Sequence, residues 1–213
     1  MEAEFWHERW HENRLGFHQE KPNALLVEHL DALRLRPGGT IFVPLCGKTL
    51  DIPWLMSQGL RVSGAELSEI AVRDLFDGMG VMPEIESVGP LKRYSADGVE
   101  IYAGDIFDLT AEVLGRVDAV FDRAALVALP GEMRRRYAAH LAAITGRARQ
   151  LLITFDYDQS VMDGPPFSVT GDMVRALYET DFSIARLEGT GVAGGLKGIA
   201  QATEEIWLLE ERA

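Results

Sequence analysis

The feature that most constrains the fold is a repeated change between short apolar runs and longer segments with helical spacing. The apolar runs are 40–44, 60–65, 99–103, 117–122 and 150–155, and helical patterns at 50–58, 68–78 and 130–144 stand between them. Strands that are apolar throughout and alternate with helices are typical of a parallel sheet covered on both faces. We therefore predict an α/β fold with a doubly wound, mostly parallel sheet.

The segments outside this alternation complete the expected architecture. Residues 182–188 and 204–210 read as two final strands, and the link between them is too short for a crossover helix, which predicts antiparallel pairing. Two small strands are expected at 84–88 and 91–95, and a helix from Thr170 to Tyr178. Two helices precede the first strand, one over 2–14 and one that begins at Pro22.

The size and charge of the chain exclude several classes of protein. A length of 213 residues suits a single domain spanning 1–213. The formal net charge of −12 disfavours nucleic acid and anionic membranes as partners. A single cysteine, Cys46, excludes an internal disulfide and fits a reducing compartment, and no apolar run is long enough to span a membrane. We expect a cytoplasmic protein without a metal.

The turn after the first strand is the expected ligand site, because ligands bind beyond the carboxyl ends of such strands. A phosphate-binding loop is rejected, since Phe42 stands where its first glycine is required. A dinucleotide fingerprint needs three glycines, and only Gly47 is present. Glu66 follows Gly47 by 19 residues, the interval at which a carboxylate reaches ribose hydroxyls. The alternative is a surface acid; if a nucleoside binds, the missing glycines favour one without phosphates, such as S-adenosylmethionine.

Two further residues at strand ends have two interpretations each. Asp105 either bonds the amine of an adenine that packs on Ile106, or caps a local turn. Arg123 either forms a salt bridge with an acid or recognises a ligand; we favour recognition, because its surroundings are apolar and arginine suits planar anions.

Other chemically suggestive residues have ordinary explanations as well. Aromatic residues near the N-terminus, among them Trp10 and Phe17, either pack an amphipathic helix onto the sheet or form a lid over a cationic ligand. His7 and His11 have the i, i+4 spacing of metal ligands, but solvation is the simpler reading. Cys46 has no histidine nearby in the sequence to activate it as a nucleophile.

Six segments taken together resemble the thiopurine S-methyltransferase family. They are Phe17-His18-Gln19-Glu20, Pro44-Leu45-Cys46-Gly47-Lys48, Gly64-Ala65-Glu66-Leu67-Ser68-Glu69, Phe107-Asp108-Leu109, Asp122-Arg123-Ala124-Ala125-Leu126-Val127 and Gly164-Pro165-Pro166-Phe167. The resemblance implies the class I S-adenosylmethionine-dependent methyltransferase fold, with a seven-stranded sheet whose last strand is antiparallel. It also implies S-adenosylmethionine as methyl donor and thiols of aromatic or heterocyclic rings, such as thiopurines, as acceptors. Bacterial members are also associated with selenium and tellurium compounds.

The resemblance assigns roles to individual positions. Donor-binding positions match Trp10, Leu45, Glu66 and Arg123, and the adenine segment matches Asp105 and Ile106, with Gly47 in the turn. Phe17 matches an aromatic residue that meets both ligands, and Arg123 would also orient the acceptor and act in catalysis. The family's mammalian form has an arginine in its C-terminal loop, where this chain has Gly194-Gly195-Leu196-Lys197-Gly198.

The expected function is therefore transfer of a methyl group to a small thiol or selenol by a monomer, with residues 1–20 as a lid helix. Two rivals remain from the residues alone. A nicotinamide-dependent oxidoreductase would need the missing glycines, and a nucleoside-binding regulator would keep Glu66 without needing a lid or an acceptor pocket.

Overall fold

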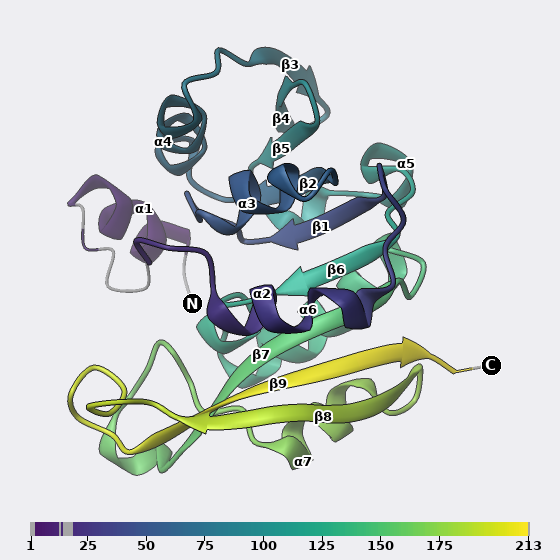
Figure 1. Cartoon of the computed structure of the whole chain (residues 1–213). Helices are drawn as coiled ribbons and strands as arrows, with labels where there is room; N and C mark the ends of the chain where they lie inside the picture. The colour runs from purple at the N-terminus through teal and green to yellow at the C-terminus, as the bar shows by residue number, and fades with distance from the viewer. Residues whose placement is uncertain (1–2, 13, 15–18, 213) are drawn as a thin grey trace.

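A single mixed sheet forms the frame of the molecule (Figure 1). The computed structural model describes residues 3–12, 14 and 19–212, and these hold nine strands in the order β3-β4-β5-β2-β1-β6-β7-β9-β8. The strands are β1 (Thr40–Pro44), β2 (Arg61–Glu66), β3 (Glu84–Val88), β4 (Leu91–Ala96), β5 (Val99–Ala103), β6 (Ala119–Asp122), β7 (Arg149–Tyr157), β8 (Phe182–Gly191) and β9 (Ala202–Glu211).

The central strands confirm the predicted topology. Strands β5, β2, β1, β6 and β7 pair in parallel, and β9 pairs antiparallel with both β7 and β8. These seven strands are the expected seven-stranded sheet. The small strands expected at 84–88 and 91–95 extend it to nine, because the two-residue turn Gly89-Pro90 folds them into a hairpin whose second strand pairs with β5.

Helices cover both faces of the sheet, as expected for a doubly wound fold. One apolar core lies under α2 (Ala24–His29), α3 (Asp51–Ser57) and α4 (Glu69–Met79). The other lies under α5 (Ala111–Leu114), α6 (Gly131–Ile144) and α7 (Gly171–Tyr178). Figure 1 shows α2 and α3 in front of the sheet and α6 behind it. Short 3₁₀ turns complete the chain: η1 (Leu30–Leu33), η2 (Ile106–Asp108), η3 (Leu126–Ala128) and η4 (Gln159–Val161).

Helix starts follow the capping chemistry of the sequence. Ser68 and Thr170 accept backbone N–H groups with their side chains at the starts of α4 and α7. The second helix begins at Ala24 rather than Pro22, because the side chain of Asn23 caps it by accepting the Leu26 N–H. The short α5 was not expected, although Thr110 caps its start and Gly115 ends it.

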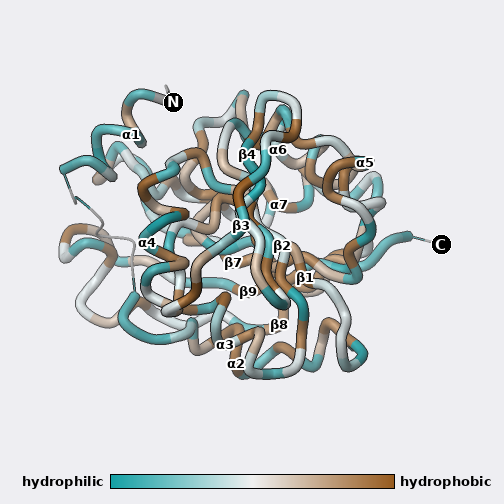
Figure 2. Tube along the Cα trace, turned by 90° about the horizontal axis from the view of Figure 1, so that it is seen from above, coloured by the Kyte–Doolittle hydropathy of each residue, from teal (hydrophilic) through white to brown (hydrophobic). Residues whose placement is uncertain are grey.

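The first helix lies at the edge of the sheet from which the ligand site opens. Helix α1 (Ala3–His11) is shorter than the predicted 2–14. In Figure 1 the arrowheads of β1 and β6 point toward the side where α1 lies, whereas β9 points away. The view from above in Figure 2 again places α1 at the margin, beside α4. Within the described residues, no helix is both long and apolar enough to cross a membrane.

Candidate functional site

Glu66, the last residue of β2, joins the ends of the first two strands of the fold. Its carboxylate accepts the backbone N–H of Gly47 at 2.8 Å through Oε2 and that of Ser68 at 2.9 Å through Oε1. The side chain is only 6% exposed. Burial raises the pKa of Glu66, and the hydrogen bonds from Ser68 and Gly47 oppose the rise. Each oxygen keeps a further lone pair, so the carboxylate can still accept hydroxyl donors.

The turn that Glu66 holds has an unusual backbone. Leu45 has a φ of +47° and Gly47 a φ of +55°, and the N–H of Cys46 donates to the Ala65 carbonyl at 3.0 Å. A bulky residue at positive φ is a rare, strained conformation that tends to occur at ligand sites. Gly47 and Glu66, the two residues that the sequence interval singled out, are joined by a direct hydrogen bond.

Cys46 lies beneath this turn and is not an activated nucleophile. Its side chain is buried, and burial and the neighbouring Glu66 raise the pKa of the thiol well above its ordinary value. A Cβ on Gly64 would lie 3.2 Å from the Cys46 sulfur and 2.7 Å from the terminal methyl of Ile101, so a larger residue there would push on both side chains. The cysteine therefore fills space under the ligand site.

A cavity of about 590 Å³ opens where the chain leaves β2, directly after Glu66, within the roughly 300–1,000 Å³ range of small-molecule sites; Glu66 itself and the other predicted donor residues are not among the residues that line it. Its walls are Leu67–Ile70 after β2, Ala103 and Gly104 at the end of β5, Pro90 and Lys92 of the hairpin, and His7, Glu8 and His11 of α1. Both histidines are exposed side chains of this wall. Helix α1 thus forms one side of a cavity whose floor is the carboxyl edge of the sheet.

Trp10 fixes α1 in this position. It is 5% exposed, and the Lys48 ammonium lies 5.9 Å from its ring centroid, so the helix packs on the turn after β1. Lys48 itself pairs with Asp74 of α4 at 2.8 Å. Of the two interpretations of the aromatic residues, the buried position of Trp10 fits packing, whereas Phe17 lies outside the described residues.

Asp105 and Ile106 follow β5 at the edge of the same cavity. The Asp105 carboxylate accepts the N–H of Phe107 at 2.9 Å and so caps η2, which is the local turn considered from the sequence. The Ile106 side chain is buried in the core under α5 and α6. The capping does not decide the adenine interpretation, since a carboxylate can accept more than one donor.

Arg123 stands at the end of β6 between two acids that the sequence did not point to. Burial lowers the pKa of Arg123, and the negative charges of Asp51 and Glu204 oppose this. Asp51 starts α3 and accepts the Asn23 N–H at 2.7 Å, and Glu204 lies on β9 opposite Phe155. Burial raises the pKa of Glu204, and Arg123 opposes the rise. Arg123 is thus a mostly buried cation with two acidic neighbours, directly after the carboxyl end of β6.

Asp122, the residue before Arg123, is wholly buried and has other hydrogen-bond partners. Its carboxylate accepts the Tyr137 hydroxyl at 2.8 Å and the Leu126 N–H at 3.1 Å. Burial raises the pKa of Asp122 to about 6, against the effect of these two hydrogen bonds. Asp122 therefore anchors the chain that presents Arg123, with α6 as its support.

The loop between β8 and β9 contacts the loop that follows β7. The Lys197 ammonium donates to the Pro165 carbonyl, and Tyr157 donates its hydroxyl to the Pro166 carbonyl at 2.7 Å. The loop between β8 and β9 is thereby joined to the Gly164–Phe167 segment of the family-like motif. Burial lowers the pKa of Lys197, and Arg9 of α1 adds to this.

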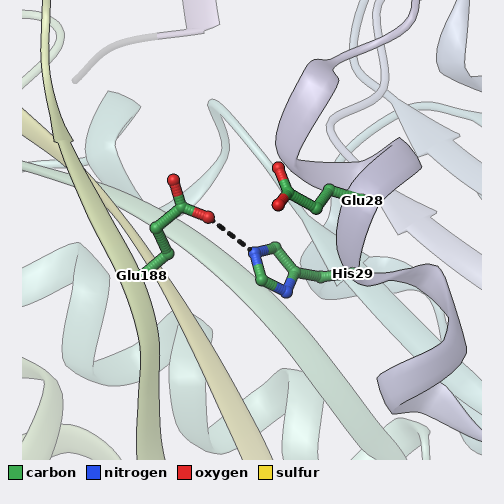
Figure 3. Close-up of side chains that lie close together, drawn as sticks. All are labelled: Glu28, His29 and Glu188. Carbon is green, nitrogen blue, oxygen red and sulfur yellow. Dashed lines mark hydrogen bonds and ion pairs between the residues drawn. The ribbon is translucent and has the colours of Figure 1, made fainter.

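Among the described residues, one cluster has the composition of a metal site. Figure 3 shows His29, the last residue of α2, between Glu28 and Glu188 of β8. The His29 Nε2 lies 3.0 Å from a Glu188 oxygen, and His29 lowers the pKa of Glu188. Glu28 is exposed. The cluster lies at the C-terminal end of α2, whereas Asp51 bonds the backbone at the N-terminal end of that helix. A hydrogen bond between His29 and Glu188 that joins α2 to β8 accounts for this arrangement.

The residues at the ends of β1 and β2 fit S-adenosylmethionine. Glu66 offers acceptor oxygens for ribose hydroxyls, the strained turn at Leu45 brings backbone close to a ligand, and no run of glycines is present for a pyrophosphate. Buried Trp10 offers an aromatic face near the turn, which suits a sulfonium cation.

Comparisons with known proteins agree with this geometry. The family model described as thiopurine S-methyltransferase matches residues 1–212. A protein of Xanthobacter autotrophicus named thiopurine S-methyltransferase is 54% identical, with 99% of each chain covered. One of Pseudomonas aeruginosa with the same name is 47% identical, again with 99% of each chain covered.

Solved structures share the fold at low sequence identity. The 1,6-didemethyltoxoflavin-N1-methyltransferase of Burkholderia thailandensis, solved with S-adenosylhomocysteine, aligns with a TM-score of 0.66 at 17% identity, over 99% of this chain and 87% of that one. An S-adenosylmethionine-dependent methyltransferase of Anabaena variabilis aligns with a TM-score of 0.64 at 14% identity, covering 99% and 95%. The fold is that of class I methyltransferases.

Proposed function

The chain belongs to the thiopurine S-methyltransferase family, and from this premise we propose that it methylates the sulfur of thiopurines and related aromatic or heterocyclic thiols. It is a methyltransferase that uses S-adenosylmethionine, and the two rival functions considered from the sequence have no support in the comparisons. Selenium and tellurium compounds are further candidate acceptors, because their anions are soft nucleophiles like thiolates. The observation that carries the donor site is the buried Glu66 carboxylate, bonded to the turn after β1.

We assign the donor to the cavity beside Glu66. The Glu66 carboxylate would accept the ribose hydroxyls, and Asp105 and Ile106 would meet the adenine. Leu45 and Gly47 would present backbone groups to the methionine end, and Trp10 would cover the sulfonium. S-Adenosylmethionine supplies a methyl group that is already activated by positive charge. The protein's own task is to position two partners and to exclude water from them.

Arg123 is the residue to which we assign work on the acceptor. The guanidinium lies in a mostly buried site, so its charge acts through little solvent on a neighbouring thiolate. It would favour the thiolate over the thiol, whose proton leaves to solvent, and would hold the sulfur in line with the methyl group. Asp51 and Glu204 add negative charge nearby and thereby keep the arginine charged. Phe17 would meet both ligands, and α1, within a lid of residues 1–20, would close over them.

The finer expectations about the protein's setting are also proposals. We propose one catalytic domain over 1–213 that acts as a cytoplasmic monomer on small molecules and does not bind nucleic acid. The net charge of −12 and the single buried cysteine support this. Light scattering after size-exclusion chromatography tests it, and the mass of a dimer would contradict it.

The experiment that tests the function is donor consumption with defined acceptors. Purified protein and S-adenosylmethionine are incubated with a thiopurine, with thiophenol, or with selenite or tellurite plus a reductant, and S-adenosylhomocysteine is quantified. Glu66→Gln should lose most turnover at subsaturating donor, whereas Glu86→Gln, the same change on the exposed edge strand β3, should not. Absence of methyl transfer to either thiol by the wild type would refute the proposal.

A further inference from the structure

Residues 105–109, the segment after β5, are contacted by a histidine of helix α6. His140 Nε2 lies 2.8 Å from the backbone carbonyl oxygen of Ile106, which is 34 residues away in the sequence. A carbonyl only accepts hydrogen bonds, so Nε2 of His140 carries the proton in this contact. The bond therefore fixes both the ring orientation of His140 and the direction of the Ile106 carbonyl.

The same helix face also holds the neighbouring Phe107. The His140 ring meets Phe107 edge-on, with centroids 5.4 Å apart. The guanidinium carbon of Arg136, one helical turn earlier, lies 3.7 Å from the centroid of that phenyl ring. Residues 136 and 140 thus contact Phe107 together, while Asp105 caps its N–H from the other direction.

The segment has little rigidity of its own. Its 3₁₀ turn is three residues long, and its internal hydrogen bonds are those of Asp108 N–H to Asp105 and Leu109 N–H to Ile106, at 3.0 and 3.1 Å. Such short turns have poor hydrogen-bond geometry. Its position at the cavity edge consequently depends on the contacts that α6 makes to it.

We propose that His140 is a positioning residue for the methyl donor: it holds the Ile106 carbonyl and Phe107 so that Asp105 and Ile106 stand where the adenine ring binds. This rests on the proposed function, since it assumes that the donor's adenine occupies this edge of the cavity. His140 does not touch the donor; it acts through the backbone of Ile106. Loss of the bond should weaken donor binding and leave the acceptor site and the chemical step unchanged.

The test compares three variants by calorimetry and kinetics. His140→Leu removes the ring N–H that bonds the Ile106 carbonyl, whereas His140→Gln keeps an N–H within reach of that carbonyl. His29→Leu is the matched control, because it also removes a histidine contact of 3.0 Å from the C-terminal part of a helix, away from the cavity. Binding of S-adenosylhomocysteine and of 5′-methylthioadenosine, which retains the adenosine half, is measured together with kcat and both KM values.

We expect His140→Leu to weaken the binding of S-adenosylhomocysteine and of 5′-methylthioadenosine by about 3- to 10-fold, the usual effect of one hydrogen bond. The donor KM should rise equally, with kcat at saturating donor and the KM for the thiol unchanged. His140→Gln should recover at least half of the affinity on a logarithmic scale, and His29→Leu should equal the wild type. If His140→Leu does not fold, His140→Gln against the same control still measures the contribution of the ring to donor affinity.

Three results would overturn the inference in distinguishable ways. If His140→Leu binds S-adenosylhomocysteine as the wild type does while Glu66→Gln binds it poorly, the donor site stands and His140 has no positioning role. If the wild type fails to bind S-adenosylhomocysteine at all, the proposed donor site is wrong and the inference fails with it. A fall in kcat without a change in donor affinity would also contradict it.

Discussion

Replacing Asp122 by asparagine should stabilise the protein at neutral pH. The carboxylate is completely buried and bonds the Tyr137 hydroxyl and the Leu126 N–H. An asparagine of the same shape can keep the Leu126 contact, because its oxygen accepts the N–H, and can reverse the Tyr137 contact, with its amide donating to the tyrosine oxygen while the tyrosine proton turns to another acceptor. The substitution therefore removes a buried charge without opening a cavity.

The magnitude follows from the pKa of Asp122, which burial raises from 3.8 to about 6. Because the folded protein holds this proton more tightly than the unfolded chain, the contribution of Asp122 to stability is most favourable below about pH 4 and is lost as the pH rises through 6. The interval corresponds to about 3 kcal/mol at 1.36 kcal/mol per pKa unit. Asp122→Asn should escape this loss, so its advantage should grow from near zero at pH 4 to about 3 kcal/mol at pH 7.

Urea unfolding at half-unit steps between pH 4 and 8 measures the effect. The difference in unfolding free energy between variant and wild type is plotted against pH, with Asp97→Asn in the exposed turn between β4 and β5 as the control. The control should give a flat line. An equally flat line for Asp122→Asn, or lower stability than the wild type at pH 7, would refute the reasoning that the buried carboxylate is ionised at a cost.

Three further outcomes concern the site itself. Glu66→Ala should weaken S-adenosylhomocysteine binding by at least about 30-fold, which calorimetry measures. It should also lower the unfolding free energy by about 2 kcal/mol in urea unfolding, because it leaves the buried N–H groups of Gly47 and Ser68 without this acceptor. Arg123→Ala should lower kcat/KM for a thiol by about 10- to 100-fold, with Arg123→Lys recovering part of it; loss of donor affinity alone, at normal turnover on saturating donor, would place Arg123 in the donor site only. Amides of residues 3–12 should exchange hydrogen more slowly when S-adenosylhomocysteine is bound, whereas equal exchange would show α1 to be fixed packing.

The sequence predicted the sheet because its strands are marked by local signals. Buried parallel strands such as β1 and β6 read as continuous apolar runs, and Ser68 and Thr170 mark helix starts by their side-chain chemistry. The extra α5 was missed because it has four residues, too few for a periodic pattern. Its capping residues, Thr110 and Gly115, were the signal that could have found it.

The site was predictable only where sequence spacing reflects a strand and its turn. The interval from Gly47 to Glu66 spans one helix and one strand, and a hydrogen bond joins the two residues; that Glu66 binds a ribose stays a prediction. The contacts of Asp122 with Tyr137 and of His140 with Ile106 join separate elements, and no local pattern encodes them. The acids near Arg123 come from α3 and β9, which only the completed sheet brings together.

The placement of β9 between β7 and β8 has a consequence for synthesis. Within the described residues β8 pairs with β9 alone, so β8 has no place in the sheet until β9, which follows it in sequence, has arrived. As the ribosome delivers the chain in order, β8 emerges as an unpaired edge that can associate with other chains. A nascent or truncated chain that lacks residues 202–211 should therefore lose two strands of the sheet rather than one.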